Sequence, residues 1–153
     1  MGAILGENLY KAVAERGQLQ RGMKIKNSPD ILDVKKASVG VGTESKPVAV
    51  VKFNFKTQYG ENSGRLEVEG ELYYMDEEKV LDQLEKEWKS DKEIKNDNIR
   101  VPLMNRILEL AFLKAIILAE QVKLPPPIMM PRIDVGNKIK EQQPKKEKAD
   151  KKT

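Results

Sequence analysis

Two adjacent segments in the middle of the chain show the clearest alternation of apolar and polar residues. In Val51–Tyr59 the odd-numbered positions are apolar or carry a hydroxyl group, and the even-numbered positions are polar. In Arg65–Tyr74 the even-numbered positions are mostly apolar and the odd-numbered ones mostly charged. A period of two is typical of strands with one buried face. The loop "GENSG" predicts an antiparallel hairpin, in which Lys56 faces Glu67 or Glu69.

The polar face of this hairpin is rich in acids. Glu67, Glu69 and Glu71 follow one another on one strand face, and lysines of the other strand lie between them. A solvated sheet face with ion pairs across the strands is the simpler interpretation. An acidic docking patch is the alternative.

The N-terminal segment predicts a helix over residues 3–16. Leu5, Leu9 and Val13 recur every four residues and form one apolar stripe. Gly17 follows the stripe as a helix stop.

A further β region precedes the hairpin. It is expected in two parts, 23–26 and 31–41, with the turn-like "NSPD" between them. The segment "GVGTESKP" (40–47) faintly resembles a phosphate-binding loop, but it lacks the Gly-Lys-Ser/Thr ending. A plain turn is therefore the favoured interpretation.

A second helix is predicted to begin near Asp76, which suits an N-cap position, with Glu77 and Glu78 at the positive end of the helix dipole. The same three acids could hold a metal ion, but helix capping explains them more simply. The apolar stripe of this helix consists of Val80, Leu81, Leu84 and Trp88.

The third helix is predicted over residues 103–122, after Pro102 in its first turn. Its apolar residues cover most of the circumference, whereas a helix on a sheet needs only one apolar stripe. A sheet can cover one side, and a second copy of the chain is the expected cover for the other. The predicted oligomer interface consists of Ile107, Leu110, Phe112, Ile116 and Ile117.

The proline-rich segment Lys123–Val135, "KLPPPIMMPRIDV", follows this helix. Prolines end the helix and keep the chain extended. One interpretation is core packing, since Leu124, Ile128 and Ile133 can close the end of a sheet. The other is a lid over a groove, with adaptable methionines at its rim.

Composition narrows the possible functions. The 153 residues are 39% hydrophobic and 34% charged, and they include neither cysteine nor histidine. Disulfides, zinc sites with Cys or His ligands, and histidine acid–base catalysis are thereby excluded. No pair of acids resembles a catalytic pair, so we expect no enzyme, no cofactor and no metal. Abundant Lys and Glu with no Cys also suits a thermophile.

Neither a secretory signal nor a run of about 20 uncharged apolar residues is present. We therefore expect a cytoplasmic protein that does not insert into membranes.

The net charge of +4 comes entirely from the C-terminal end. We predict a single domain over residues 1–137 and a basic tail over 138–153. Seven lysines and three acids in the tail account for the whole excess. The tail is either a disordered solubilising segment or a nucleic-acid contact that binds phosphates without reading bases. The candidate contacts are Lys138, Lys140, Lys145, Lys146, Lys148, Lys151 and Lys152.

The order of these segments resembles the SecB family of export chaperones. Two early strands, the hairpin "VAVVKFNFKTQYGENSGRLEVEGELYYM", the helix "VPLMNRILELAFLKAIILAEQV" and "KLPPPIMMPRIDV" carry the resemblance, over about Met23 to Val135. It implies an α+β fold: a four-stranded antiparallel sheet with helices on one face, and dimers or tetramers. The N-terminal helix and the lysine-rich tail depart from the family pattern.

The resemblance also implies a function. SecB proteins are holdase chaperones that bind unfolded or nascent chains in hydrophobic grooves. Carried over, the groove candidates are Phe53, Phe55, Tyr74, Trp88, Ile128, Met129 and Met130. The alternative is a ribosome-associated factor that binds rRNA or ribosomal proteins through the basic tail, in translation regulation such as dormancy, subunit dimerisation or anti-association.

Overall fold

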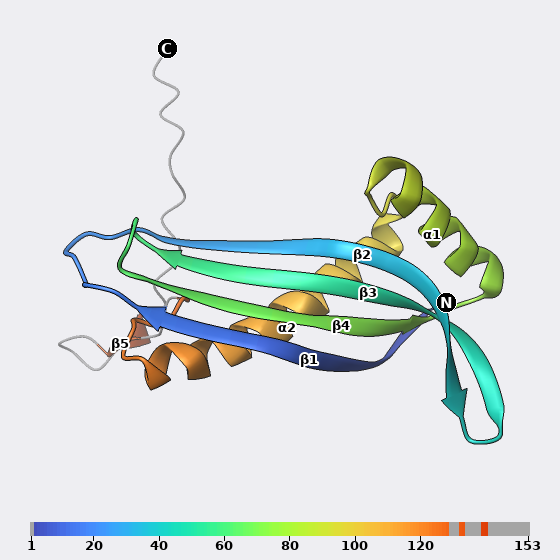
Figure 1. Cartoon of the computed structure of the whole chain (residues 1–153), viewed down its shortest axis with the longest axis horizontal. Helices are drawn as coiled ribbons and strands as arrows, with labels where there is room; N and C mark the ends of the chain where they lie inside the picture. The colour runs from blue at the N-terminus through green and yellow to red at the C-terminus, as the bar shows by residue number, and fades with distance from the viewer. Residues whose placement is uncertain (1, 129–131, 134–138, 141–153) are drawn as a thin grey trace, which may run out of the picture.

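A four-stranded antiparallel sheet forms the body of the protein, in a computed structural model that describes residues 2–128, 132–133 and 139–140 (Figure 1). The strand order is β1-β4-β3-β2. The strands are β1 (Ala3–Arg16), β2 (Ile25–Val41), β3 (Glu44–Tyr59) and β4 (Gly64–Met75). Two helices, α1 (Glu78–Asp91) and α2 (Asp97–Gln121), pack on the sheet, and β5 (Arg132–Ile133) pairs with β6 (Ile139–Lys140). The predicted α+β class, with four antiparallel strands and helices on one face, is confirmed.

The hairpin of β3 and β4 forms as its alternation predicts. Lys56 lies opposite Glu67, the first of the two expected partners. Phe53 lies opposite Gly70, where an added Cβ would come within 2.5 Å of the Asn8 carbonyl oxygen in β1 and 3.1 Å of the Phe53 ring. Glycine at this position therefore lets the backbone of β1 approach closely and leaves room for the aromatic ring.

The predicted helix over 3–16 is wrong, because this segment is the edge strand β1 paired with β4. Its register shifts twice, between Ile4 and Gly6 and between Leu9 and Lys11. Each such β-bulge adds a residue and reverses the alternation. The inward side chains therefore follow no simple period of two, and the spacing of Leu5, Leu9 and Val13 imitated a helical stripe.

The predicted break between strands at 23–26 and 31–41 is also wrong. The "NSPD" segment lies inside β2, and Pro29 pairs with Phe55. An edge strand tolerates proline because one side of its backbone needs no ladder partner. The turn before β3 is only Gly42 and Thr43, with Gly42 at a φ of 65°. "GVGTESKP" is thus mostly paired strand around a two-residue hairpin turn.

Neither helix begins at its predicted residue. The N-cap of α1 is Glu77 rather than Asp76, and the Asp76 carboxylate accepts a hydrogen bond from the Glu77 N–H. α2 begins at Asp97, five residues before Pro102, because the Asn96 side chain caps it by accepting the Asn98 N–H. A side-chain cap satisfies one of the free N–H groups of the first turn.

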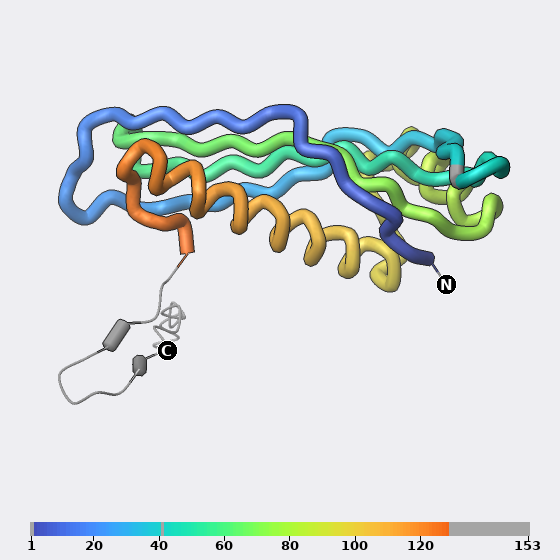
Figure 2. The backbone as a smooth tube through the Cα atoms, turned by 90° about the horizontal axis from the view of Figure 1, so that it is seen from below, coloured from blue at the N-terminus to red at the C-terminus, as the bar shows by residue number. Residues whose placement is uncertain are grey.

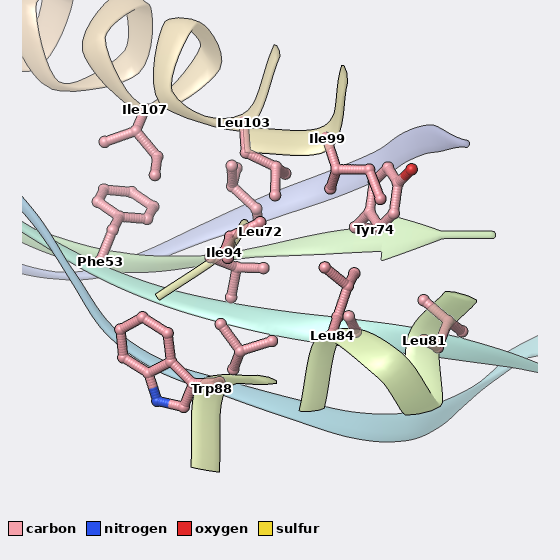
Figure 3. Packing of buried hydrophobic residues seen from close by; sticks show 13 residues of the cluster. Phe53, Leu72, Tyr74, Leu81, Leu84, Trp88, Ile94, Ile99, Leu103 and Ile107 are labelled. Atoms are coloured by element: carbon pink, nitrogen blue, oxygen red, sulfur yellow. The ribbon is translucent and has the colours of Figure 1, made fainter. Parts of the chain in front are cut away.

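The core lies between the sheet and the helices as two clusters of buried side chains. One joins α1, the connector residue Ile94 and the first half of α2 to the sheet around Phe53 (Figure 3). The other joins the second half of α2 and Leu124 to the sheet around Phe55. α2 runs along one face of the sheet (Figure 2) and contributes to both clusters.

Candidate functional site

The solvent side of α2 is apolar over much of its length. Leu113 is 63% exposed and Ile117 is 52% exposed, although each lies two residues from a buried alanine on either side. Large apolar side chains that are grouped and exposed indicate an interaction surface more often than single ones do.

One flank of α2 faces the edge strand β1. Arg106 marks this flank, because its guanidinium donates to the Glu7 carboxylate of β1 at 2.8 Å. Leu110, Leu113 and Ile117 follow at helical spacing and share the flank with Arg106. We call Leu110, Leu113 and Ile117 the β1 flank.

The chain reverses direction at the end of α2. Lys123 takes the left-handed conformation with a φ of 57°, and Leu124 N–H bonds back to the Ala119 carbonyl at 2.8 Å. A left-handed residue after the last turn is a common way to stop a helix. The prolines that follow cannot rejoin it. We call Lys123–Ile128 the strap.

Three side chains of the sheet hold the strap by its backbone carbonyls. Arg16 donates to the Lys123 carbonyl at 2.9 Å, and Tyr59 donates through its hydroxyl to the Pro125 carbonyl. Asn27 donates to the Pro127 carbonyl at 3.0 Å and accepts a hydrogen bond from the buried Thr57 hydroxyl. Because prolines supply no N–H groups, their carbonyls are the natural points of attachment.

Two hollows lie between α2 and the strap. One, of about 490 Å³, is walled by Ile116, Pro125 and Pro126, with Leu19 of the β1–β2 loop at its edge. The second, of about 430 Å³, is walled by Leu108, Phe112 and Ile128. We call the two hollows together the strap groove.

The walls of the strap groove can accept apolar side chains from an extended chain. Leu19 is 39% exposed and Ile128 is 37% exposed, so water reaches both. Burying such groups against a partner is worth roughly 25 cal/mol per Å² of apolar surface. Glu109, Glu120 and Lys123 also line the hollows and provide a sparse polar rim. Such walls suit binding by shape and apolar contact.

Tyr59, which donates to the strap, has a raised pKa. Burial raises the pKa of the Tyr59 hydroxyl to about 12. The hydroxyl therefore stays neutral, and able to donate to the strap, up to a higher pH than the hydroxyl of an exposed tyrosine.

The outer face of the sheet carries paired charges. Glu67 is 6% exposed, accepts the Asn54 side-chain amide at 2.9 Å, and pairs with Lys11 and Arg65 at 3.3 Å each. The hydrogen bond from Asn54, with the nearby lysines, holds the pKa of Glu67 below its usual value. The charge of this carboxylate is balanced by its ion pairs with Lys11 and Arg65. This agrees with the interpretation of the acidic strand as a sheet face with ion pairs across the strands.

The predicted groove residues lie in three different places. Phe53, Phe55, Tyr74 and Trp88 are core residues with at most 6% of their surface exposed. Ile128 lines the strap groove. Met129 and Met130 lie outside the described residues. None of the four core aromatics lines the strap groove. Phe55 contacts Phe112 of the groove wall, whereas the other three belong to the core cluster around the first half of α2.

The predicted interface residues are also divided. Ile107 is fully buried against the sheet. Leu110 and Ile117 lie on the β1 flank, whereas Phe112 and Ile116 line the strap groove. Phe112 also makes an edge contact with Phe55, with ring centroids 5.0 Å apart. One predicted surface is thus two surfaces on opposite sides of the helix.

Sequence reasoning missed Leu19, Leu108 and the first prolines of the strap as groove residues. Leu19 lies in a loop, where hydrophobic periodicity gives no signal. Its apolar character next to Gly17 and several polar residues was the available clue.

The candidate nucleic-acid contacts of the tail fall almost entirely outside the described residues. These are Lys138, Lys145, Lys146, Lys148, Lys151 and Lys152, and only the backbone of Lys140 is described. Within the described ranges no group of three or more Asp or Glu side chains is placed to hold a metal ion. The described helices also include none that is both long and apolar enough to cross a bilayer.

Comparisons with known proteins find little in sequence. No protein-family model and no curated protein matches the chain. Among solved structures, the chain is similar to the Mycobacterium tuberculosis Rv1957 SecB-like chaperone, in complex with a ChAD peptide from the Rv1956 HigA1 antitoxin. The two share 14% identity with a TM-score of 0.44, over 82% of this chain and 86% of that one.

Proposed function

We propose that this chain is a non-catalytic, SecB-like holdase that binds unfolded or nascent polypeptides in the strap groove. The observation that carries the proposal is the pair of apolar hollows between α2 and the strap. Their combined length follows α2 from Asn105 to Glu120, about 23 Å at 1.5 Å per residue. An extended segment of about seven residues would fill that length at roughly 3.3 Å per residue.

The strap is suited to this role because its position does not depend on a client. Three side chains of the sheet already hold its carbonyls, so binding does not require the strap to be ordered first. A preformed groove avoids part of the entropy cost of association. The resemblance of the sequence to the SecB family supports the same assignment.

The test is binding of fluorescein-labelled, reduced and carboxymethylated α-lactalbumin, which stays unfolded in buffer. Ile116→Asp places a charge in the groove wall and should weaken binding at least about tenfold, which is about 1.4 kcal/mol. Val101→Asp is the matched control, since it places the same charge on the same helix at a residue that is 47% exposed. Equal affinities for the two variants would falsify the proposal.

We also propose that two copies associate through the β1 flank. This flank offers exposed leucine and isoleucine beside an open strand edge, and it leaves the strap groove free. A symmetric homodimer is the commonest way for a small protein to cover such a surface.

A second candidate function is ribosome association through the basic tail. It is supported by the sequence, because residues 138–153 hold the whole net charge of +4. Contacts with rRNA phosphates should weaken as salt rises. Sedimentation of lysate on sucrose gradients tests this proposal. Co-migration with ribosomal particles that is lost in high salt or on deleting 138–153 supports it, and unchanged binding of the truncated chain contradicts it.

A further inference from the structure

A separate cavity lies at the opposite end of α2 from the strap. Its volume is about 860 Å³, larger than either hollow of the strap groove and within the range of about 300–1,000 Å³ that ligand pockets show. It lies where the start of β1, the end of β4 and the first turns of both helices meet. The strap groove does not include this cavity.

The walls of the cavity are apolar. Ile4 comes from β1, Val80 from α1, and Ile99 and Pro102 from α2. Tyr74 of β4 lies beside Ile99 at the end of the core cluster (Figure 3). Such walls suit a hydrocarbon chain or the methylene stem of a long side chain.

Two carboxylates stand at the rim of the same cavity. Asp76 accepts hydrogen bonds from the Tyr74 hydroxyl at 2.6 Å and from the Glu77 N–H at 2.7 Å. These bonds fix the Asp76 carboxylate at the wall, and an ionised carboxylate has room for further donors. The Glu77 side chain is exposed beside it.

Neither rim carboxylate has an ion-pair partner among the described residues. Their neighbour Glu78, by contrast, pairs with Lys36 at 2.8 Å. Lys36 is thus engaged by Glu78 and Asp82 of α1, and Arg100 pairs with Asp97. Among the described residues that line the cavity, the charged side chains are Asp76 and Glu77, so this lining carries a negative charge.

We propose that this cavity binds a basic side chain, arginine or lysine, of the polypeptide held by the protein. The methylene stem would lie against Ile4, Val80 and Pro102, and the charged end would meet Asp76 and Glu77. Arginine fits best, because its planar guanidinium offers five donors and is weakly hydrated. This inference rests on the proposed function and adds a preference for one class of residue in the client.

The distance between the two sites sets the spacing of such a residue. Pro102 and Ile116 are separated by about 21 Å along α2 at 1.5 Å per residue. An extended chain covers that distance with about six or seven residues. A client with a basic residue this far from an apolar segment would engage both sites.

The test uses short probes that isolate the cavity from the groove. N-acetyl-Ile-Arg-Val-amide is compared with the same peptide containing citrulline, a neutral analogue of arginine, by NMR titration of the ¹⁵N-labelled chain. We expect the arginine peptide to shift the amides of Glu77, Asn98 and Ile99, and to bind at least about fivefold more tightly.

Asp76→Asn combined with Glu77→Gln should reduce the affinity for the arginine peptide to that for the citrulline peptide. Glu77→Gln alone, at an exposed position, should weaken binding about twofold and keeps the test valid if the double variant folds poorly. Glu93→Gln is the matched control, since Glu93 is exposed in the α1–α2 connector and outside the cavity. Equal affinity for both peptides, or an equal loss in the control, overturns the proposal.

Failure here is distinguishable from failure of the holdase proposal. If only the cavity assignment is wrong, Ile116→Asp still weakens binding of unfolded α-lactalbumin while the arginine preference is absent. If the holdase proposal is wrong, Ile116→Asp has no effect whatever the tripeptides do.

Discussion

The two sides of α2 are similar in composition but differ in their surroundings. The side that faces the sheet buries Leu103 and Ile107 completely, and it continues through Ala111, Ala115 and Ala119. The solvent side carries Leu113 and Ile117, which are larger than those alanines and yet more than half exposed. Hydrophobicity alone therefore does not tell which side of this helix is the core.

Size explains the difference better than polarity does. The three alanines recur every four residues, so the second half of α2 can approach the sheet closely around Phe55. Larger side chains on that side would hold the helix away from the sheet. The bulky residues on the other side remain available for partners, and stability and binding are thus divided between two sides of one helix.

The largest expected effect comes from removing a side chain on the sheet side. Ile107→Ala deletes a fully buried group from the first core cluster. Losses of this kind cost about 2–5 kcal/mol of unfolding free energy. Urea denaturation followed by the fluorescence of Trp88, the single tryptophan, measures this loss.

Measuring the affinity of Ile107→Ala for a client tests whether the two sides of α2 act independently. Under conditions where Ile107→Ala remains folded, its affinity for unfolded α-lactalbumin should stay within about twofold of the wild type. A loss as large as that of Ile116→Asp would mean that the two sides of the helix are not independent.

Substitutions on the β1 flank should reduce stability less than Ile107→Ala does, and they should disrupt association of two copies. Leu113→Asp combined with Ile117→Asp should change the unfolding free energy by less than about 0.5 kcal/mol per exposed site. Size-exclusion chromatography with light scattering should show a shift from dimer to monomer. A wild-type chain that is already monomeric would contradict the proposed association, and Val101→Asp again serves as the charge control.

The sequence predicted the central part of the fold because its signals there are local. β3 and β4 alternate without interruption, and a short loop joins them, so the partner of Lys56 could be narrowed to Glu67 or Glu69. The structure places Lys56 opposite Glu67. The stripe of α1 was equally regular, and Leu81, Leu84 and Trp88 are indeed its buried residues.

The edge strands failed for a physical reason that a single sequence does not reveal. Two bulges in β1 broke the alternation and produced a spacing of four. β2 contains Pro29, which is compatible with a strand only at an edge, and no local pattern says which strand is at the edge.

The sequence predicted which segments form the candidate site, but not which residues line it. The excess of apolar residues on α2 indicated one partner surface besides the sheet, and the prolines indicated an extended strap. The aromatics of the hairpin were expected to line the groove because the family resemblance implied it, but they are buried in the core between the sheet and the helices. Which side of an apolar helix meets the sheet depends on packing across distant segments, and periodicity cannot supply that information when both sides are apolar.

The smallest expected effect concerns the attachment that sets the position of the strap beside α2. Tyr59→Phe removes the hydroxyl that donates to the Pro125 carbonyl and leaves the buried ring in place. One such hydrogen bond contributes about 1 kcal/mol to stability. We expect a loss of that size near pH 8 by urea denaturation, with a weaker affinity for unfolded α-lactalbumin because one wall of the groove is less firmly held.

The pH dependence separates this hydrogen bond from a general packing effect. Burial raises the pKa of Tyr59 to about 12 in the folded chain, above its ordinary value of about 10. The neutral hydroxyl is therefore favoured by folding, and its contribution is complete below about pH 10 and is lost as the pH rises through about 12. The difference in unfolding free energy between the wild type and Tyr59→Phe should shrink from pH 10 upward. Burial and the nearby Asp76 also raise the pKa of Tyr74, which remains in both chains and cancels in the difference. A difference that stays constant from pH 8 to pH 11.5 would show that folding does not keep the Tyr59 hydroxyl buried and neutral beneath the strap.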